Sequence, residues 1–473
     1  MASAKAAFST PTTKEDPYTY QVGFGNSFAS EAIPGTLPVG QNSPQKVKYG
    51  LYAEGVNGTS FVAPRAENQR TWLYRMRPSV AHEGFVLAEQ NPYFLKLTTN
   101  FSANDPKIHV SPTQLAWHPL DVPNEPTDFF QGLRTYAGNG DPLLREGIAI
   151  HVYLANKSME KKAYVNSDGD MLILPQQGRL DIQTELGSLM VRPGELVVIQ
   201  RGLKFKVTLP DGPVRGYIQE IYGSHYELPE LGPLGANGLA NVRDFEHPVA
   251  KFEIDTNTPW EIVYKVGGKL FSCKQNHTPF DVVAWHGNYV PYKYAMEKFI
   301  GVGSITKDHI DPSIFCVLTA KSKTPGTPLA DFLIFSGRWD VATGTFRPPY
   351  FHRNCASELM GLIYGDYEGR SDTFRPGSVS YETGFCPHGV SWEVYNAAST
   401  MELTPQRVHE GTLAFMFESS MMFGITDFAM KSDKLHEHEP GMWNDLKNNF
   451  VEEIDQVNAD LKAAGLPALV QGQ

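Results

Sequence analysis

Two histidines and one glutamate in the last third of the sequence have the types and spacing of a metal site. His352 and Glu358 are six residues apart, and His388 follows within Pro387-His388-Gly389. In a strand, residues an even number apart point to the same face, so both side chains could enter one barrel. Two imidazoles and a carboxylate are the ligand set of non-haem Fe(II) oxygenases, but zinc hydrolases use a similar set. Residue types alone do not identify the metal. The alternative to a metal site is that these are ordinary strand histidines and a solvated glutamate.

A further histidine and two cysteines lie close to these residues in the sequence. His309, within Asp308-His309-Ile310-Asp311, could act as an acid or base beside a metal, although a loop histidine without a role is the alternative. Cys355 and Cys386 flank the candidate ligands, but thiolates would make the wrong ligand set for iron oxygenation. We therefore expect both cysteines to be buried apolar side chains.

Composition and motifs exclude several other classes of protein. The net charge of −11 argues against a nucleic-acid-binding protein, which would carry a basic field. No stretch approaches the roughly 18 apolar residues of a membrane span. Four cysteines without a Cys-x-x-Cys pair indicate a reducing compartment, and we expect a cytoplasmic protein. The sequence has no dinucleotide-binding, P-loop or Gly-x-Ser-x-Gly motif.

Short apolar runs separated by turns predict a mainly β protein that would position these residues. The 473 residues include 42 glycines and 34 prolines, which favours many turns. The spacing of the runs is typical of a sandwich or barrel, with strands expected at 148–154, 171–175, 179–184, 189–191 and 196–199 and a second block at 299–426. The best helix candidate is 451–470, where apolar residues recur at helical spacing.

Several longer segments resemble the homogentisate 1,2-dioxygenase family. Tyr350 to Glu358, continued by Met360-Gly361-Leu362-Ile363, is similar to the iron-ligand segment of that family. Further similar segments follow the family's order, at 20–26, 51–54, 70–75, 166–170, 235–241, 283–289 and 414–420. The resemblance covers about residues 18–450.

The resemblance implies an architecture and an assembly. A large N-terminal β-sandwich or barrel domain is expected at 18–297, a cupin-like β-barrel that holds iron at 298–450, and a short helical tail at 451–473. Fe(II) is the implied cofactor, O₂ the co-substrate and a small aromatic diphenol the substrate. The family also implies a homo-oligomer, a hexamer made of two trimers.

The resemblance also assigns roles to single residues by position. His352, Glu358 and His388 match the iron ligands of the family. His309 matches its acid/base histidine, and Tyr367 matches a tyrosine that contacts the substrate. His388 is therefore expected to border the substrate as well as the metal.

One departure from the family lies close to the last ligand. The family usually has a histidine six residues before that ligand, where this chain has Glu382. If Glu382 points inward it is a substrate-binding residue that disfavours an anionic substrate, and if it points outward the change is silent. Three functions stay open: cleavage of homogentisate to maleylacetoacetate, cleavage of a neutral hydroquinone such as methoxyhydroquinone in the breakdown of lignin-derived aromatics, and a metal-binding cupin without catalysis.

Overall fold

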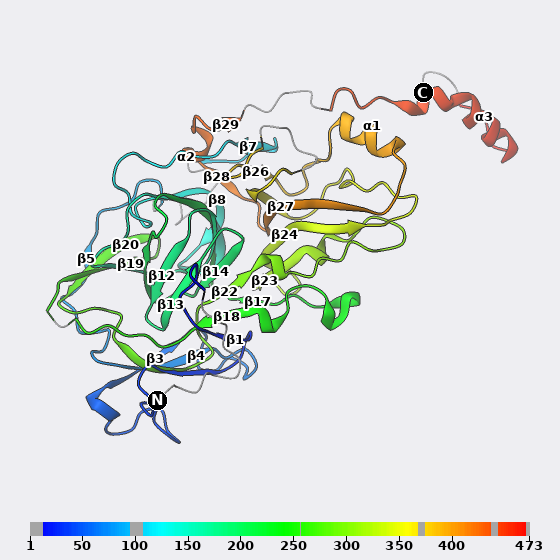
Figure 1. Cartoon of the computed structure of the whole chain (residues 1–473). Coiled ribbons are helices and arrows are strands. Elements are labelled where there is room, and N and C mark those ends of the chain that lie inside the picture. The colour runs from blue at the N-terminus through cyan, green and yellow to red at the C-terminus, as the bar shows by residue number, and fades with distance from the viewer. Residues whose placement is uncertain (1–12, 95–106, 256, 368–373, 437–442, 470–473) are drawn as a thin grey trace.

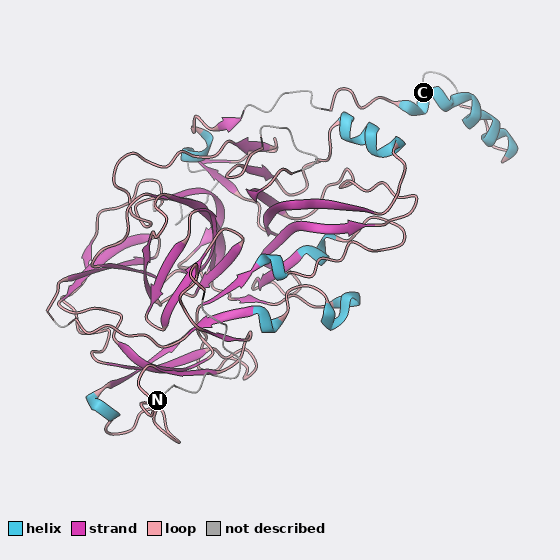
Figure 2. Cartoon of the chain, viewed as in Figure 1, coloured by secondary structure: helices cyan, strands magenta, loops and turns pink. Residues whose placement is uncertain are grey.

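The computed structural model describes residues 13–94, 107–255, 257–367, 374–436 and 443–469. These residues form four β-sheets with a few short helices at their edges (Figure 1, Figure 2). The prediction of a mainly β protein with a short C-terminal helix is confirmed. Within the described ranges, none of the helices has the length and apolar character that crossing a bilayer requires.

A ten-stranded sheet lies in the middle of the molecule and is buried on both faces. Leu172 packs into one hydrophobic core and its neighbour Ile173 into another, because successive side chains of a strand point to opposite faces. This explains the continuous apolar runs in the sequence. The strands in spatial order are β1 (Tyr20–Val22), β18 (Phe245–Pro248), β22 (Tyr292–Ala295), β14 (Glu195–Ile199), β11 (Gly169–Gln177), β16 (Val214–Tyr222), β9 (Glu146–Ala155), β8 (Leu133–Asp141), β28 (Gly424–Thr426) and β6 (Ile108–His109).

Two smaller sheets complete the N-terminal part. The seven-stranded sheet shares a core with the ten-stranded sheet. Across these two sheets, four of the five strands predicted between 148 and 199 fall within observed ones, and the fifth, 179–184, begins one residue before β12. Its strands are β13 (Gly187–Val191), β12 (Leu180–Thr184), β15 (Lys204–Thr208), β10 (Lys162–Asn166), β19 (Trp260–Val266), β20 (Lys269–Gln275) and β5 (Val86–Leu87). The four-stranded sheet contains β2 (Phe28–Glu31), β21 (Val282–Gly287), β4 (Arg70–Arg75) and β3 (Tyr52–Asn57).

An eight-stranded sheet covers the other face of the ten-stranded sheet and carries Glu358, one of the three candidate metal ligands. Leu359 and Phe417 pack in the same core as Leu172. The N-terminal and C-terminal parts of the chain also exchange strands. β7, from the N-terminal part, joins the eight-stranded sheet, and β28, from the C-terminal part, joins the ten-stranded one. The strands in order are β17 (Tyr226–Glu227), β23 (Cys316–Lys321), β24 (Pro328–Asp340), β27 (Gln406–Ser419), β25 (Ser357–Tyr364), β26 (Val379–Glu382), β7 (Leu115–Trp117) and β29 (Leu435–His436).

The helices are short and peripheral. The predicted helix at 451–470 is observed as a 3₁₀ turn followed by α3, which ends before Gly465 and projects from the body of the protein (Figure 1). Helix α1 was not predicted; the side chain of Ser391 caps it by accepting a hydrogen bond from the amide of Val394. The helices are α1 (Trp392–Thr400), α2 (Asp427–Met430), α3 (Ile454–Ala463), η1 (Lys48–Gly50), η2 (Gly232–Asn237), η3 (Val242–Asp244), η4 (Met296–Lys298), η5 (Pro312–Phe315) and η6 (Asn449–Glu453).

Candidate metal centre

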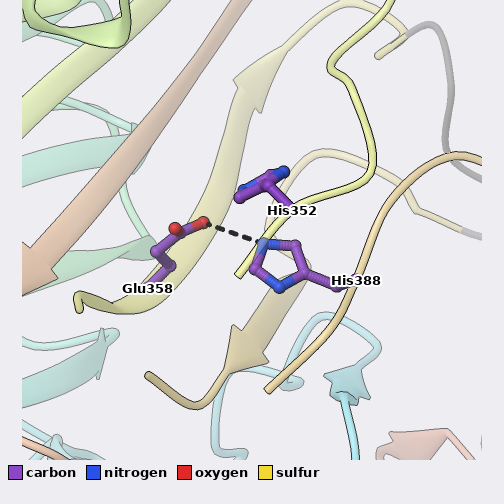
Figure 3. A group of neighbouring side chains, drawn as sticks. All are labelled: His352, Glu358 and His388. Carbon is purple, nitrogen blue, oxygen red and sulfur yellow. Dashed lines mark ion pairs between the residues drawn. The ribbon is translucent and has the colours of Figure 1, made fainter. Parts of the chain in front are cut away.

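The three residues predicted to bind metal lie together at one end of the eight-stranded sheet. His352, Glu358 and His388 each offer a ligand atom, and these atoms lie within 4.8 Å of one another. Nε2 of His388 is 3.6 Å from Oε2 of Glu358, and the two imidazole ring centres are 4.2 Å apart (Figure 3). The arrangement could hold one cation among two imidazoles and one carboxylate.

The reason these residues meet differs from the one that their spacing suggested. His352 and Glu358 do not share a strand, because the backbone bends at Cys355 before β25 begins at Ser357. Instead, His352 forms an isolated β-bridge with His388, and each amide donates to the other's carbonyl at 3.1 and 3.2 Å. The prediction that His352 and Glu358 lie on one face of one strand is therefore wrong, although the side chains do converge.

Backbone carbonyls fix the orientation of both imidazoles. Nδ1 of His352 is 2.7 Å from the carbonyl oxygen of Tyr350, and Nδ1 of His388 is 3.0 Å from that of Cys386. A carbonyl oxygen can only accept, so each Nδ1 carries the proton and each Nε2 keeps its lone pair. Nε2 of His388 is buried and has no hydrogen-bond partner among the described residues. An unpaired buried nitrogen facing a carboxylate and a second imidazole fits a bound cation.

Asn354 orients the carboxylate. Its side-chain amide donates to Oε1 of Glu358 at 2.6 Å, while its own oxygen accepts from the amide of Ala356 at 3.0 Å. Glu358 is only 5% exposed, and burial by itself would raise its pKa. The neighbouring imidazole of His388 and the hydrogen bond from Asn354 outweigh burial and hold the pKa of Glu358 below its ordinary value. Glu358 is thus kept ionised, with Oε2 directed toward the histidines.

We expect Asn354→Ala to weaken metal binding while leaving the fold intact. The substitution removes the hydrogen bond that holds Oε1 of Glu358. Loss of such a supporting hydrogen bond typically costs about 10- to 100-fold in metal affinity. Competition with a metal-sensitive dye measures this directly, and an affinity equal to that of the wild-type protein would show that Asn354 does not orient the ligand.

Four carboxylates form a row across neighbouring strands at the level of Glu358. Asp331 on β24 pairs with Glu418 on β27, Glu418 with Glu358, and Glu358 with Glu382 on β26. Directly paired residues point to the same face of a sheet. We call the face of the eight-stranded sheet on which these four carboxylates lie the ligand face. Burial, with Glu358 and Asp331 nearby, raises the pKa of Glu418 to about 8, so this carboxyl group holds its proton at neutral pH. Asp331 and Glu418 were not predicted from the sequence, although the alternation in Phe415-Met416-Phe417-Glu418 could have revealed an inward glutamate.

Glu382 lies inside the protein. It is 3% exposed, pairs with Glu358 and accepts a hydrogen bond from the side-chain amide of Gln114, just before β7. The alternative that Glu382 points outward is therefore excluded.

His309 reaches the same region from a different segment. Its ring centre is 4.9 Å from that of Tyr350, which lies 5.5 Å from that of His352. Nδ1 of His309 is 2.9 Å from the carbonyl oxygen of Ile310, so the proton sits on Nδ1 and Nε2 can accept another. The structure thus places this histidine one aromatic ring away from a candidate ligand.

Tyr367 follows the end of β25 and packs on the ligand face. Its ring stacks on His409 at 5.0 Å and meets Phe335 edge-on at 6.2 Å. Its hydrophobic neighbours include Met360, two residues beyond Glu358 on β25. Tyr367 is therefore a packed aromatic that also borders the site.

The prediction for the two cysteines that flank the ligands was wrong. Cys355 is exposed and Cys386 is partly exposed, whereas we expected both to be buried. Both lie in the turns that carry the histidine bridge, and the backbone there runs along the surface.

Comparison with known proteins identifies the family. A model described as homogentisate 1,2-dioxygenase N-terminal matches residues 19–296, and one described as homogentisate 1,2-dioxygenase C-terminal matches 297–450. Helix α3 lies outside both matches. Among solved structures, a cupin 2 conserved barrel domain protein from Leptotrichia buccalis is 9% identical, with a TM-score of 0.25 over 72% of this chain and 98% of that chain.

Curated relatives match nearly the whole chain. The homogentisate 1,2-dioxygenase of Emericella nidulans is 49% identical over 443 residues, covering 92% of this chain and 97% of that protein. The homogentisate 1,2-dioxygenase of Caenorhabditis elegans is 51% identical, covering 92% and 98%, and that of Homo sapiens is 48% identical, covering 91% and 96%. The chain therefore belongs to the homogentisate 1,2-dioxygenase family.

Proposed function

We propose that this protein cleaves the aromatic ring of homogentisate with O₂, using Fe(II) held by His352, Glu358 and His388. The observation that carries the proposal is the fixed orientation of the two imidazoles, whose protonated Nδ1 atoms leave Nε2 facing Glu358. Homogentisate as the substrate is supported by relatives of that name at 48–51% identity over more than nine-tenths of the chain. They do not favour a neutral hydroquinone or a cupin without catalysis.

The residues of the site divide the work of this reaction. Bound Fe(II) would supply a Lewis acid for a substrate hydroxyl and a route for electrons from the ring to O₂. His309 accepts the hydroxyl proton on Nε2, because its Nδ1 is already committed to a backbone carbonyl. Tyr367 and its apolar neighbours pack against the substrate ring and exclude water. Both oxygen atoms enter the product, so homogentisate, C₈H₈O₄, becomes maleylacetoacetate, C₈H₈O₆.

The product tests the reaction class. The full-length Fe(II)-loaded protein should convert homogentisate under ¹⁸O₂ into a product that carries both labelled atoms and is heavier by the mass of one O₂ molecule. Mass spectrometry with rapid quenching, which limits exchange of the carbonyl oxygen, reads this out. Incorporation of a single oxygen atom, or oxidation to a quinone without incorporation, would contradict ring cleavage.

We expect Glu382→Gln to improve the use of homogentisate. The carboxylate of Glu382 lies beside Glu358 and repels the carboxylate of the substrate, whereas an amide of the same shape keeps a hydrogen bond to Gln114. The KM for homogentisate should fall by a factor of about two to ten, as expected for one charge at a distance with partial screening. The KM for methoxyhydroquinone should stay the same, and equal changes for the two substrates would argue against a charge effect.

We propose the assembly of the family, a hexamer of two trimers, and a cytoplasmic location. The free state of all four cysteines supports a reducing compartment. Analytical ultracentrifugation should give six times the mass of one 52.6 kDa chain. A monomer at micromolar concentration would contradict the assembly.

A further inference from the structure

A polar corner made of Arg338, Tyr367 and His409 lies beyond the apolar part of the ligand face. Along β24, the side chains of Asp331, Leu333 and Phe335 follow one another on that face because they are two residues apart. Asp331 belongs to the acidic row, and Leu333 and Phe335 pack with apolar neighbours. Acidic groups therefore lie at one end and apolar side chains in the middle. Arg338 is three residues after Phe335, and its contact with Phe315, which packs against Phe335, places it at the other end.

A β-bulge forms this corner. Ser336 on β24 pairs with Leu413, but Arg338, two residues later, pairs with Val408, so β27 carries extra residues at this point. His409 within the bulge has φ of 54°, a left-handed conformation that is uncommon for residues other than glycine. This conformation turns His409 toward Tyr367, on which it stacks. Strained bulges of this kind are frequent beside functional sites.

Two nitrogen atoms in the corner are buried without an acceptor. Nε of Arg338 and Nδ1 of His409 have no hydrogen-bond partner among the described residues. No carboxylate in the described part of the chain lies within 4.0 Å of the Arg338 guanidinium group, and the nearby Asp340 instead pairs with Arg347 at 3.2 Å. Buried polar nitrogens without partners are costly, and a carboxylate can accept from Nε of Arg338 and, in the tautomer that carries its proton there, from Nδ1 of His409.

The corner borders the side of the site where His309 and Tyr367 lie. The guanidinium carbon of Arg338 is 4.7 Å from the ring centre of Phe315, which is 5.1 Å from that of Phe335. The cluster that contains Phe315 also includes Ile310, the residue after His309. Phe335 in turn contacts Tyr367. A substrate held between the metal ligands and Tyr367 therefore has its far end directed toward Arg338.

We propose that Arg338, assisted by His409, binds the carboxylate of the substrate and thereby selects an anionic hydroquinone. The inference rests on the proposed function and identifies the residues that determine its specificity. The acidic row repels the substrate carboxylate from the Glu382 end, and Arg338 attracts it at the opposite end. The ring then lies over the apolar middle of the ligand face. A guanidinium group and a carboxylate form paired, charge-assisted hydrogen bonds, which give strength and orientation together.

Binding of phenylacetate, which has the carboxylate but no hydroxyl group to react, tests this proposal. Calorimetric titration of the Fe(II)-loaded full-length protein without O₂ should show binding that Arg338→Met weakens roughly tenfold to a hundredfold. His409→Phe keeps the stack on Tyr367 and removes a donor, so it should weaken binding severalfold. Arg407→Met removes an exposed cation of β27 that pairs with Glu410, and it should leave binding unchanged.

Kinetics give a second readout on the same variants. Arg338→Met should raise the KM for homogentisate by a factor similar to its effect on phenylacetate, with the KM for methylhydroquinone unchanged. Equal effects on both substrates, or wild-type binding of phenylacetate, would overturn the proposal. Arg338→Lys keeps the charge without the paired geometry and should give an intermediate effect, which keeps the proposal testable if Arg338→Met does not fold.

Failure of this proposal differs from failure of the proposed function. Binding of phenylacetate that depends on Arg338, in a protein that consumes no O₂ with homogentisate, would support the carboxylate site and contradict the reaction. Turnover of homogentisate with the same KM in the wild-type and Arg338→Met proteins would support the reaction and contradict the carboxylate site.

Discussion

Replacement of His352 by alanine should abolish O₂ uptake with homogentisate and strip most of the metal from the protein. The imidazole supplies one of the three ligand atoms that converge within 4.8 Å among the described residues, and the two that remain cannot hold a cation as firmly. Substitution of a residue that only supports a ligand typically lowers metal affinity about 10- to 100-fold. Substitution of a ligand itself should therefore lower metal affinity more than a hundredfold. Metal content by mass spectrometry after desalting, together with oxygen-electrode rates, measures both effects.

The control for His352→Ala is a histidine outside the site. His118 lies next to His436, away from the metal ligands, so His118→Ala should keep its metal and its activity. The bridge between His352 and His388 uses backbone atoms, so the alanine variant keeps these hydrogen bonds and should fold. A folded His352→Ala protein with full metal content and full activity would overturn the ligand assignment.

Replacement of His309 by alanine should lower kcat with almost no change in bound metal. His309 has no ligand atom in the metal group, and its proposed role is to accept the proton of the substrate hydroxyl. Loss of a positioned general base typically costs about 100- to 10,000-fold in rate. Added imidazole should restore part of the activity, because it can occupy the vacated space and accept the same proton.

Steady-state rates and metal content, measured on one preparation, separate this outcome from that for His352. A His309→Ala protein that has lost its metal would make His309 a structural support for the ligands. Wild-type kcat with a normal metal content would remove it from the mechanism altogether.

The sequence predicted the strands of the N-terminal half well because their side chains are buried on both faces. Residues 171–175 and 196–199 are continuous apolar runs, and both became central strands between two other sheets. Helix α1 was missed because none of its residues is buried, so it lacks the apolar stripe that reveals a helix. The C-terminal helix was predicted but ends early, since Gly465 and Pro467 stop it.

The residues of the site could be named from the sequence, but the reason for their convergence could not. Spacing suggested one strand for His352 and Glu358, whereas a turn and a bridge between distant segments bring the ligands together. Such long-range pairing leaves no local pattern in a single sequence. The direction of Glu382 was likewise undecidable, because it depends on the pairing of β26 with β25.

The corner around Arg338 was not visible in the sequence at all. Its geometry depends on a bulge in β27 that places His409 over Tyr367, two residues about forty positions apart in the chain. The lack of a partner for two buried nitrogen atoms emerges only from the packed structure. The family resemblance thus implied the reaction class, while the proposed determinants of specificity required the register of the eight-stranded sheet.

Oxygen uptake by the full-length protein, loaded anaerobically with Fe(II), tests the central claim most directly. Homogentisate and methoxyhydroquinone are added in parallel at equal concentrations. The account predicts rapid uptake of one O₂ per homogentisate, and slow uptake with methoxyhydroquinone, which lacks the carboxylate that Arg338 would bind. Uptake with methoxyhydroquinone alone, or no uptake with either compound despite full iron content, would contradict it.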